Sequence, residues 1–172
     1  LALLENLVPV YREVLQRFAA QGVEWVQIDE PILVLDLPAS WKQAYLRCYD
    51  QLVAAAPLKL LLATYFGELD DNLFTALELP VAGLHLDLVR APQQLEKVLP
   101  RLGNKILSAG IIDGRNNWRT DLDRATFLLA DAAAQLAERL WLAPSCSLQP
   151  VPVAPVPGAQ PNAQINSRLR FS

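Results

Sequence analysis

Apolar runs of β-strand length alternate five times with segments of helical periodicity, and this alternation restricts the fold more than any other feature. The runs are short, rich in leucine or β-branched residues, and bounded by proline, glycine or charged residues; they cover residues 25–31, 59–65, 83–89, 105–112 and 140–144. Apolar residues at helical spacing occupy the other segments, at residues 4–18, 40–52, 72–79, 92–99 and 120–136. Strict alternation predicts parallel strands joined by helical crossovers, with helices covering the sheet.

Capping signals mark several helix ends. Gly22 follows the last periodic residue of the first helix, where a glycine commonly ends a helix. Ser40 with Gln43 three residues later has the pattern of a capping box. Thr120 and Asp123 are expected to cap the last helix.

The length of 172 residues and the 52% hydrophobic content predict one domain with a sizeable core. An open doubly wound sheet and part of a (β/α)8 barrel both fit the alternation. A complete barrel takes about 250 residues, so this chain is roughly three βα units short of one. Because the chain contains no Met, we expect it to be a piece of something longer. Residues 149–172 are rich in proline and are expected to be an extended or disordered tail.

Charge and hydropathy exclude several classes of function. The 15 Lys and Arg against 18 Asp and Glu give a formal charge of −3, which leaves no basic stripe for a nucleic-acid backbone. No stretch of about 18 uncharged apolar residues could span a membrane, and residues 1–20 do not read as a signal peptide. The two Cys, 98 positions apart, do not make a disulfide framework. A cytoplasmic location is the default expectation.

Each predicted strand delivers a polar or reactive group at its carboxyl end, where parallel α/β folds place their sites. The first strand ends in Asp29 and Glu30, which as neighbours point to opposite faces, so at most one faces a barrel mouth; Asp29 is favoured. His85 lies between two leucines, and such a lone histidine is more often structural than a ligand. Cys146 fits a thiolate ligand or nucleophile, or a small buried side chain.

A second candidate group follows the fourth strand. Arg115 and Arg119, with Trp118 between them, could grip a carboxylate or a conjugated ring. Alternatively, the Gly and Asn residues of this segment turn the chain, and the two arginines pair with Asp113 and Asp121. The residues themselves leave both interpretations open.

Five motifs at the strand ends also occur in the order found in one protein family. They are residues 25–31 (Trp-Val-Gln-Ile-Asp-Glu-Pro), 62–66 (Leu-Ala-Thr-Tyr-Phe), 83–89 (Gly-Leu-His-Leu-Asp-Leu-Val), 107–116 (Leu-Ser-Ala-Gly, then Asp-Gly-Arg-Asn) and 144–148 (Pro-Ser-Cys-Ser-Leu). Over residues 1–148 the chain resembles cobalamin-independent methionine synthase, in the later part of its amino-terminal half. The resemblance implies strands four to eight of the amino-terminal barrel of an enzyme with two face-to-face (β/α)8 barrels.

The resemblance also implies a chemistry. The family transfers a methyl group from 5-methyltetrahydrofolate polyglutamate to the thiolate of homocysteine, and a zinc ion in the carboxy-terminal barrel activates that thiol. The positions here that match the zinc ligands of the catalytic half are Leu62, Thr64, Asp87 and Cys146, which implies no zinc in this chain. Asp29 matches the aspartate that holds the homocysteine amino group there.

We therefore expect a non-catalytic piece of a methyltransferase in methionine biosynthesis, inactive alone, whose partner is the carboxy-terminal catalytic barrel. The candidates for substrate contacts are Asp29, Glu30, Arg115, Trp118 and Arg119. A stand-alone module that binds a folate-like or other polycarboxylate small molecule is one alternative, and a truncation product without function is another. In the family the segment after residue 148 continues as helix, whereas here it is rich in proline.

Overall fold

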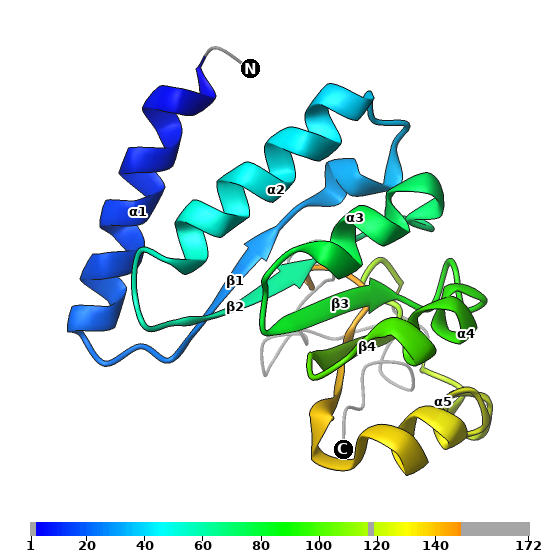
Figure 1. Ribbon diagram of the computed structural model, residues 1–172. Helices are drawn as coiled ribbons and strands as arrows, with labels where there is room; N and C mark the ends of the chain where they lie inside the picture. Colours follow the sequence, from blue (N-terminus) through cyan, green and yellow to red (C-terminus); the bar gives the residue numbers. More distant parts are fainter. Residues whose placement is uncertain (1–2, 117–118, 149–172) are drawn as a thin grey trace, which may run out of the picture.

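The computed structural model describes residues 3–116 and 119–148, and in them five parallel strands form one sheet (Figure 1). The strands are β1 (Trp25–Asp29), β2 (Lys59–Ala63), β3 (Gly83–Asp87), β4 (Ile106–Ile112) and β5 (Leu140–Pro144). Their order in the sheet is their order in the chain, and every neighbouring pair is parallel. A doubly wound sheet reverses its strand order at a switch point. The unreversed order decides between the two predicted architectures in favour of the partial barrel.

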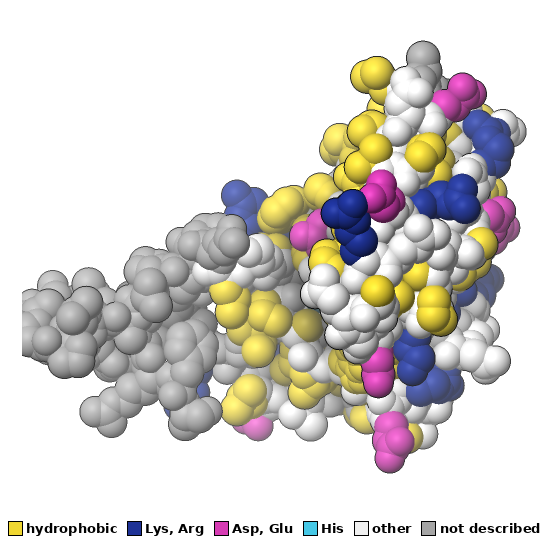
Figure 2. Space-filling model, turned by 90° about the vertical axis from the view of Figure 1, so that its left-hand side faces the viewer, with side chains coloured by type: hydrophobic (Ala, Val, Ile, Leu, Met, Phe, Trp, Pro, Cys, Tyr) yellow, Lys and Arg dark blue, Asp and Glu magenta, His cyan; other side chains and the backbone are white. Residues whose placement is uncertain are grey.

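One helix precedes β1, and a helix connects each successive pair of strands, as predicted. They are α1 (Leu4–Ala20), α2 (Ala39–Val53), α3 (Leu73–Glu78), α4 (Gln94–Val98) and α5 (Leu122–Leu136), with short 3₁₀ turns at Pro31–Val34, Asp70–Asn72, Leu99–Arg101 and Ala137–Arg139. α1 packs beside α2 and leaves much of its apolar surface exposed (Figure 2).

One predicted cap is confirmed and two are wrong. Gly22 adopts a φ of +81° after α1, and its N–H donates to the carbonyl of Ala19. At α2 the N-cap position is Pro38 and no side chain caps the helix, so the Ser40–Gln43 capping box does not form. Asp121, not Thr120 or Asp123, caps α5, because its carboxylate stands before the first turn and accepts from the backbone N–H of Arg124.

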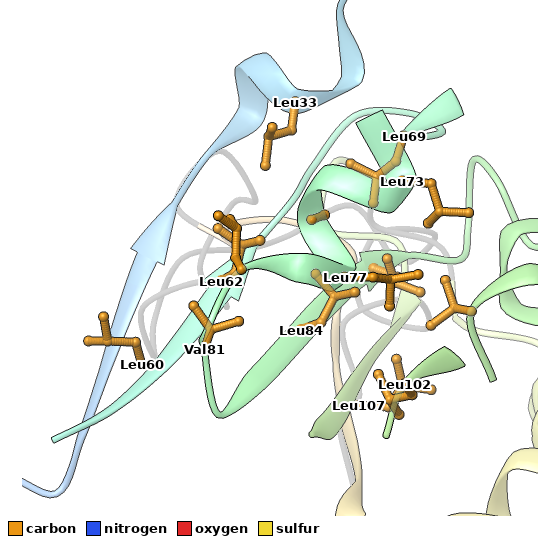
Figure 3. Packing of buried hydrophobic residues seen from close by; sticks show 14 of the residues in the cluster. Leu33, Leu60, Leu62, Leu69, Leu73, Leu77, Val81, Leu84, Leu102 and Leu107 are labelled. Atoms are coloured by element: carbon orange, nitrogen blue, oxygen red, sulfur yellow. The ribbon is translucent and has the colours of Figure 1, made fainter. Parts of the chain in front are cut away.

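The core lies between the sheet and the helices. Alternate strand residues point toward the helical layer; Leu60, Leu62, Leu84, Leu86 and Leu107 are buried there with leucines from the segment 69–79 (Figure 3). Burial of each of these leucines stabilises the fold by about 2 kcal/mol relative to leaving it in water.

The other face of the sheet is the inner face, which would line a barrel. Trp25 on β1 and Trp141 on β5 meet there edge to face, with ring centroids 4.9 Å apart. In a flat sheet the first and fifth strands would stand about 19 Å apart. The contact therefore requires a strongly curled sheet, as in a section of a barrel wall.

Candidate functional site

The carboxyl ends of the strands gather most of the sequence-predicted polar residues, and Asp29 and Glu30 lie on opposite faces as expected. Asp29 is exposed on the inner face. Its Oδ1 accepts hydrogen bonds from Gln27 Nε2 at 2.7 Å and from the Tyr65 hydroxyl at 3.1 Å. Gln27 Nε2 also donates to the Tyr65 hydroxyl at 2.7 Å. Two donors thus fix the position of Oδ1 on a residue that is exposed.

Glu30 turns instead to the helical layer. Its two carboxylate oxygens accept from the hydroxyls of Tyr45 (2.8 Å) and Tyr49 (2.9 Å) on α2. Burial raises the pKa of Glu30, the two hydroxyl bonds partly oppose that rise, and the charge of Asp29 adds to it. Burial and the facing carboxylate raise the pKa of both tyrosines. Glu30 therefore anchors α2 to the end of β1.

His85 lies at the centre of the inner face and is only 4% exposed. Its Nδ1 bonds the hydroxyl of Ser108 at 2.9 Å, and its ring meets Tyr65 edge to face at 5.4 Å. Among the described residues, the buried Nε2 has no hydrogen-bond partner of standard geometry. Burial lowers the pKa of His85, and the Ser145 backbone and the carboxylates of Asp87 and Asp29 oppose that shift. The favoured form is a neutral imidazole.

Asp87 organises the loops at this end of the sheet. Its buried carboxylate accepts from the backbone N–H groups of Phe66, Val89 and Arg90 at 3.0 to 3.2 Å. The Arg90 guanidinium also donates to it at 3.2 Å. Backbone donors from two connections therefore converge on one charge, which is a strong arrangement because charge-assisted bonds exceed neutral ones.

Arg90 extends this network to the last two strands. It forms an ion pair with Asp113 after β4 at 3.6 Å and donates to the hydroxyl of Ser145 after β5 at 3.4 Å. The Ser145 hydroxyl also accepts from the N–H of Gly114 at 3.2 Å. The loops after β3, β4 and β5 are thus fixed to one another.

Two residues of the second candidate group, Arg115 and Arg119, lie in the part of the chain that the structure describes. The Arg115 guanidinium lies 5.2 Å from the ring centre of Phe66, a cation–π contact. Asp113 pairs with the Arg90 guanidinium and also accepts from the backbone N–H of Arg115, while Asp121 caps α5. Arg119 lines a groove of about 720 Å³ between α4 and α5. Trp118 lies outside the described residues.

The positions that match zinc ligands do not converge. Leu62 is buried against the helices, and the Thr64 hydroxyl donates to the His85 carbonyl at 2.7 Å. Asp87 is occupied by its four donors, and Cys146 packs against Ala63 and Tyr65. Within residues 3–116 and 119–148, no three His, Cys, Asp or Glu side chains are grouped so as to hold a metal ion. These residues do not fit a zinc site.

Sequence reasoning missed Gln27, and it placed Tyr65 and Arg90 at strand ends without assigning either a role. Gln27 stands two residues before Asp29 on a strand and so shares its face, a periodicity that could have paired them. Nothing in the sequence marks Arg90 as the link between three loops, because its partners lie as far as 55 residues away.

The curled parallel sheet, with its helices on one face and its polar groups at the carboxyl ends, defines a section of a (β/α)8-type barrel. The profile of a family described as "Cobalamin-independent synthase, N-terminal domain" matches residues 1–137. The chain belongs to the cobalamin-independent methionine synthase family and corresponds to its N-terminal domain.

Solved structures share the fold at low sequence identity. A B12-independent methionine synthase from Shewanella sp. W3-18-1, solved with selenomethionine, has a TM-score of 0.66 and 14% identity over 95% of this chain and 50% of its own. A protein described as a putative vitamin-B12 independent methionine synthase, from Listeria monocytogenes, has a TM-score of 0.63 and 18% sequence identity, over 85% of this chain and 48% of its own. A methyltransferase from Methanosarcina mazei has a TM-score of 0.62 and 15% sequence identity, over 84% of this chain and 42% of its own. The chain thus spans about half the length of these proteins or less.

In the part of the chain that the structure describes, no helix combines the length and the apolar character needed to cross a bilayer.

Proposed function

We propose that this chain is a non-catalytic part of a cytoplasmic methyltransferase that moves a methyl group from 5-methyltetrahydrofolate polyglutamate to homocysteine. Residues 1–148 supply strands four to eight of the N-terminal barrel, which braces the carboxy-terminal catalytic barrel and forms one side of the substrate cleft. The zinc ion that activates the thiol belongs to that partner barrel. Residues 149–172 have no role in this proposal.

The observation that carries the proposal is the use of the Asp87 carboxylate. In a metal-activated methyl transfer an acid at this strand end would have to be free to bind the metal or the substrate. Here three backbone N–H groups and Arg90 occupy it. This end of the sheet is organised to hold loops in place, which is what a bracing domain requires.

Two of the candidate side chains remain available to a ligand. Asp29 presents a fixed, exposed carboxylate, and Arg115 presents a guanidinium over an aromatic ring. We assign them to the cleft side of the barrel as contacts for polar parts of a substrate. Glu30 contributes only through its contacts with α2.

Methyl transfer measured in two ways tests the proposal. The purified 172-residue chain is assayed with homocysteine and methyltetrahydrofolate triglutamate, alone and mixed with a separately produced carboxy-terminal barrel of the family. The barrel by itself is the control. We expect no turnover by this chain alone and a higher rate for the mixture than for the barrel alone. Turnover by the chain alone, or a mixture no faster than the control, overturns the proposal.

A second candidate function is a stand-alone module that binds a folate-like or other polycarboxylate ligand. The observation that favours it is the stacking of Arg115 on Phe66, because a guanidinium held on a ring is oriented for a carboxylate. Calorimetry with a folate triglutamate should then show binding that Arg115→Ala weakens and Arg101→Ala, at another exposed cation–π contact, does not. No heat at high ligand concentration excludes this function.

A further inference from the structure

Phe66, just after β2, has a backbone conformation that an aromatic residue rarely adopts. Its φ is +76°, in the left-handed region, although the next residue is Gly67, which could adopt such an angle without strain. The Phe66 side chain is 47% exposed, so burial of the ring does not compensate for the strain. Strained residues cluster at sites where a side chain has to be held for a ligand. The strain therefore points to a role for the ring, over which the Arg115 guanidinium lies.

A carboxylate oxygen holds the backbone of each residue of this pair. The Phe66 N–H donates to Asp87 Oδ2 at 3.1 Å, and the Arg115 N–H donates to Asp113 Oδ1 at 3.0 Å. Asp87 is the last residue of β3, and Asp113 directly follows β4. These two bonds fix each backbone to its own strand end. The position of the guanidinium relative to the ring then depends on how the two carboxylates are placed relative to each other.

Arg90 joins the same two oxygens. Its Nη1 donates to Asp87 Oδ2 at 3.2 Å, and its Nη2 lies 3.6 Å from Asp113 Oδ1. A guanidinium is planar and its nitrogens are a fixed distance apart, so contacts at two of them set the separation of the two carboxylates. The side chain of Asp87 is fully buried and that of Arg90 is 28% exposed. Water and salt therefore screen the contact between them much less than a surface ion pair.

We propose that Arg90 is a positioning residue, which holds the Arg115 guanidinium over the Phe66 ring by bridging Asp87 and Asp113. Arg90 does not itself contact the substrate. Arg115 is exposed, so a carboxylate of the substrate meets a guanidinium whose position is already set, and less ordering has to accompany binding. The inference rests on the proposed function in one respect, because it takes Arg115 as a contact for a polar part of the substrate.

NMR of the 172-residue chain tests the positioning without any ligand. The Phe66 ring shifts the resonances of the Arg115 side chain upfield, and Phe66→Leu gives their positions without the ring. We expect Arg90→Ala and Arg90→Lys to lose most of that shift, because lysine keeps the charge but has no planar fork to bridge two carboxylates. Arg139→Ala is the matched control and should keep the shift, since Arg139 also bonds two groups, both of them backbone carbonyls just before β4. A shift retained in both Arg90 variants, or lost equally in Arg139→Ala, overturns the inference.

Kinetics give a second readout, which a purely structural role would not move. In the mixture with the carboxy-terminal barrel, Arg90→Ala and Arg115→Ala should each raise the KM for methyltetrahydrofolate triglutamate about tenfold and leave kcat unchanged. The double variant should raise it no further, and Arg139→Ala should change neither constant. A KM raised by Arg115→Ala but not by Arg90→Ala overturns the inference. If Arg115→Ala itself leaves the KM unchanged, Arg115 is not a substrate contact and that part of the proposed function fails, whereas the NMR result still decides the role of Arg90.

Discussion

Replacing Asp87 by alanine should destabilise the chain more than any other single change at the strand ends. The carboxylate is fully buried and receives three backbone N–H bonds and one guanidinium bond. Each hydrogen bond to a charged group contributes about 1.5 to 3 kcal/mol. The loss is smaller than the sum of the four, because Arg90 is exposed and its freed groups regain water. We therefore expect Asp87→Ala to lower the free energy of unfolding by about 4 kcal/mol, in the range for breaking a buried charge pair.

Urea unfolding followed by tryptophan fluorescence measures this change, since Trp25 and Trp141 join the two edges of the sheet. Asp87→Asn keeps an oxygen that can accept from Val89 and Arg90, so its loss should be about half as large, roughly 2 kcal/mol. Asp113→Ala is the matched control. It breaks only a longer, partly exposed ion pair and one turn bond, and should cost less than about 1 kcal/mol. An Asp87→Ala loss below about 1 kcal/mol at an unchanged m-value would refute the reasoning.

Three further predictions concern packing and protonation. Gly110→Ala should cost about 2 to 3 kcal/mol, because the added Cβ would lie 2.7 Å from the Leu86 carbonyl and 2.8 Å from the Ser145 backbone, whereas Gly67→Ala meets only ordinary contacts and should change the urea midpoint little. Because burial raises the pKa of Glu30, the protonated carboxyl group stabilises the fold fully below the ordinary pKa of 4.5, and this stabilisation is lost as the pH rises through the folded pKa. The free energy of unfolding of Glu30→Gln should therefore increase relative to that of the parent chain as the pH rises above 4.5. A difference that stays constant with pH would contradict this. Because burial lowers the pKa of His85, its contribution to the stability of the folded chain is complete above pH 6.5 and is lost as the pH falls from there. The NMR titration of this sole histidine should therefore have its midpoint below pH 6.5 in the folded chain. A midpoint at or above pH 6.5 would show that the imidazole is not desolvated.

Much of the fold follows from periodicity. The strand segments 25–31 and 83–89 were placed correctly because apolar runs ending in proline or charge are local signals, and the parallel arrangement follows from their alternation with helices. The predicted caps of α2 and α5 were wrong. Several polar residues lie within one turn of each helix start, and which of them takes the N-cap position depends on where the loop enters the helix.

The candidate site was predictable only where it is local. The opposite orientation of Asp29 and Glu30 follows from strand geometry and is observed. The partners of Glu30, Tyr45 and Tyr49, are set by the packing of α2 on the sheet, which no spacing in the sequence specifies. For the same reason the use of Asp87 as a loop anchor could not be read from its neighbours along the chain.

The meeting of Trp25 and Trp141 gives the fold an internal optical marker. Two indoles 4.9 Å apart, held edge to face, couple their electronic transitions and should produce a paired near-ultraviolet circular dichroism signal. That signal depends on the curl of the sheet and not on helix content. A state in which the helices persist but the first and last strands separate would lose the paired signal while keeping its far-ultraviolet spectrum. Circular dichroism spectra would therefore distinguish the curled sheet from a flattened one without any added label.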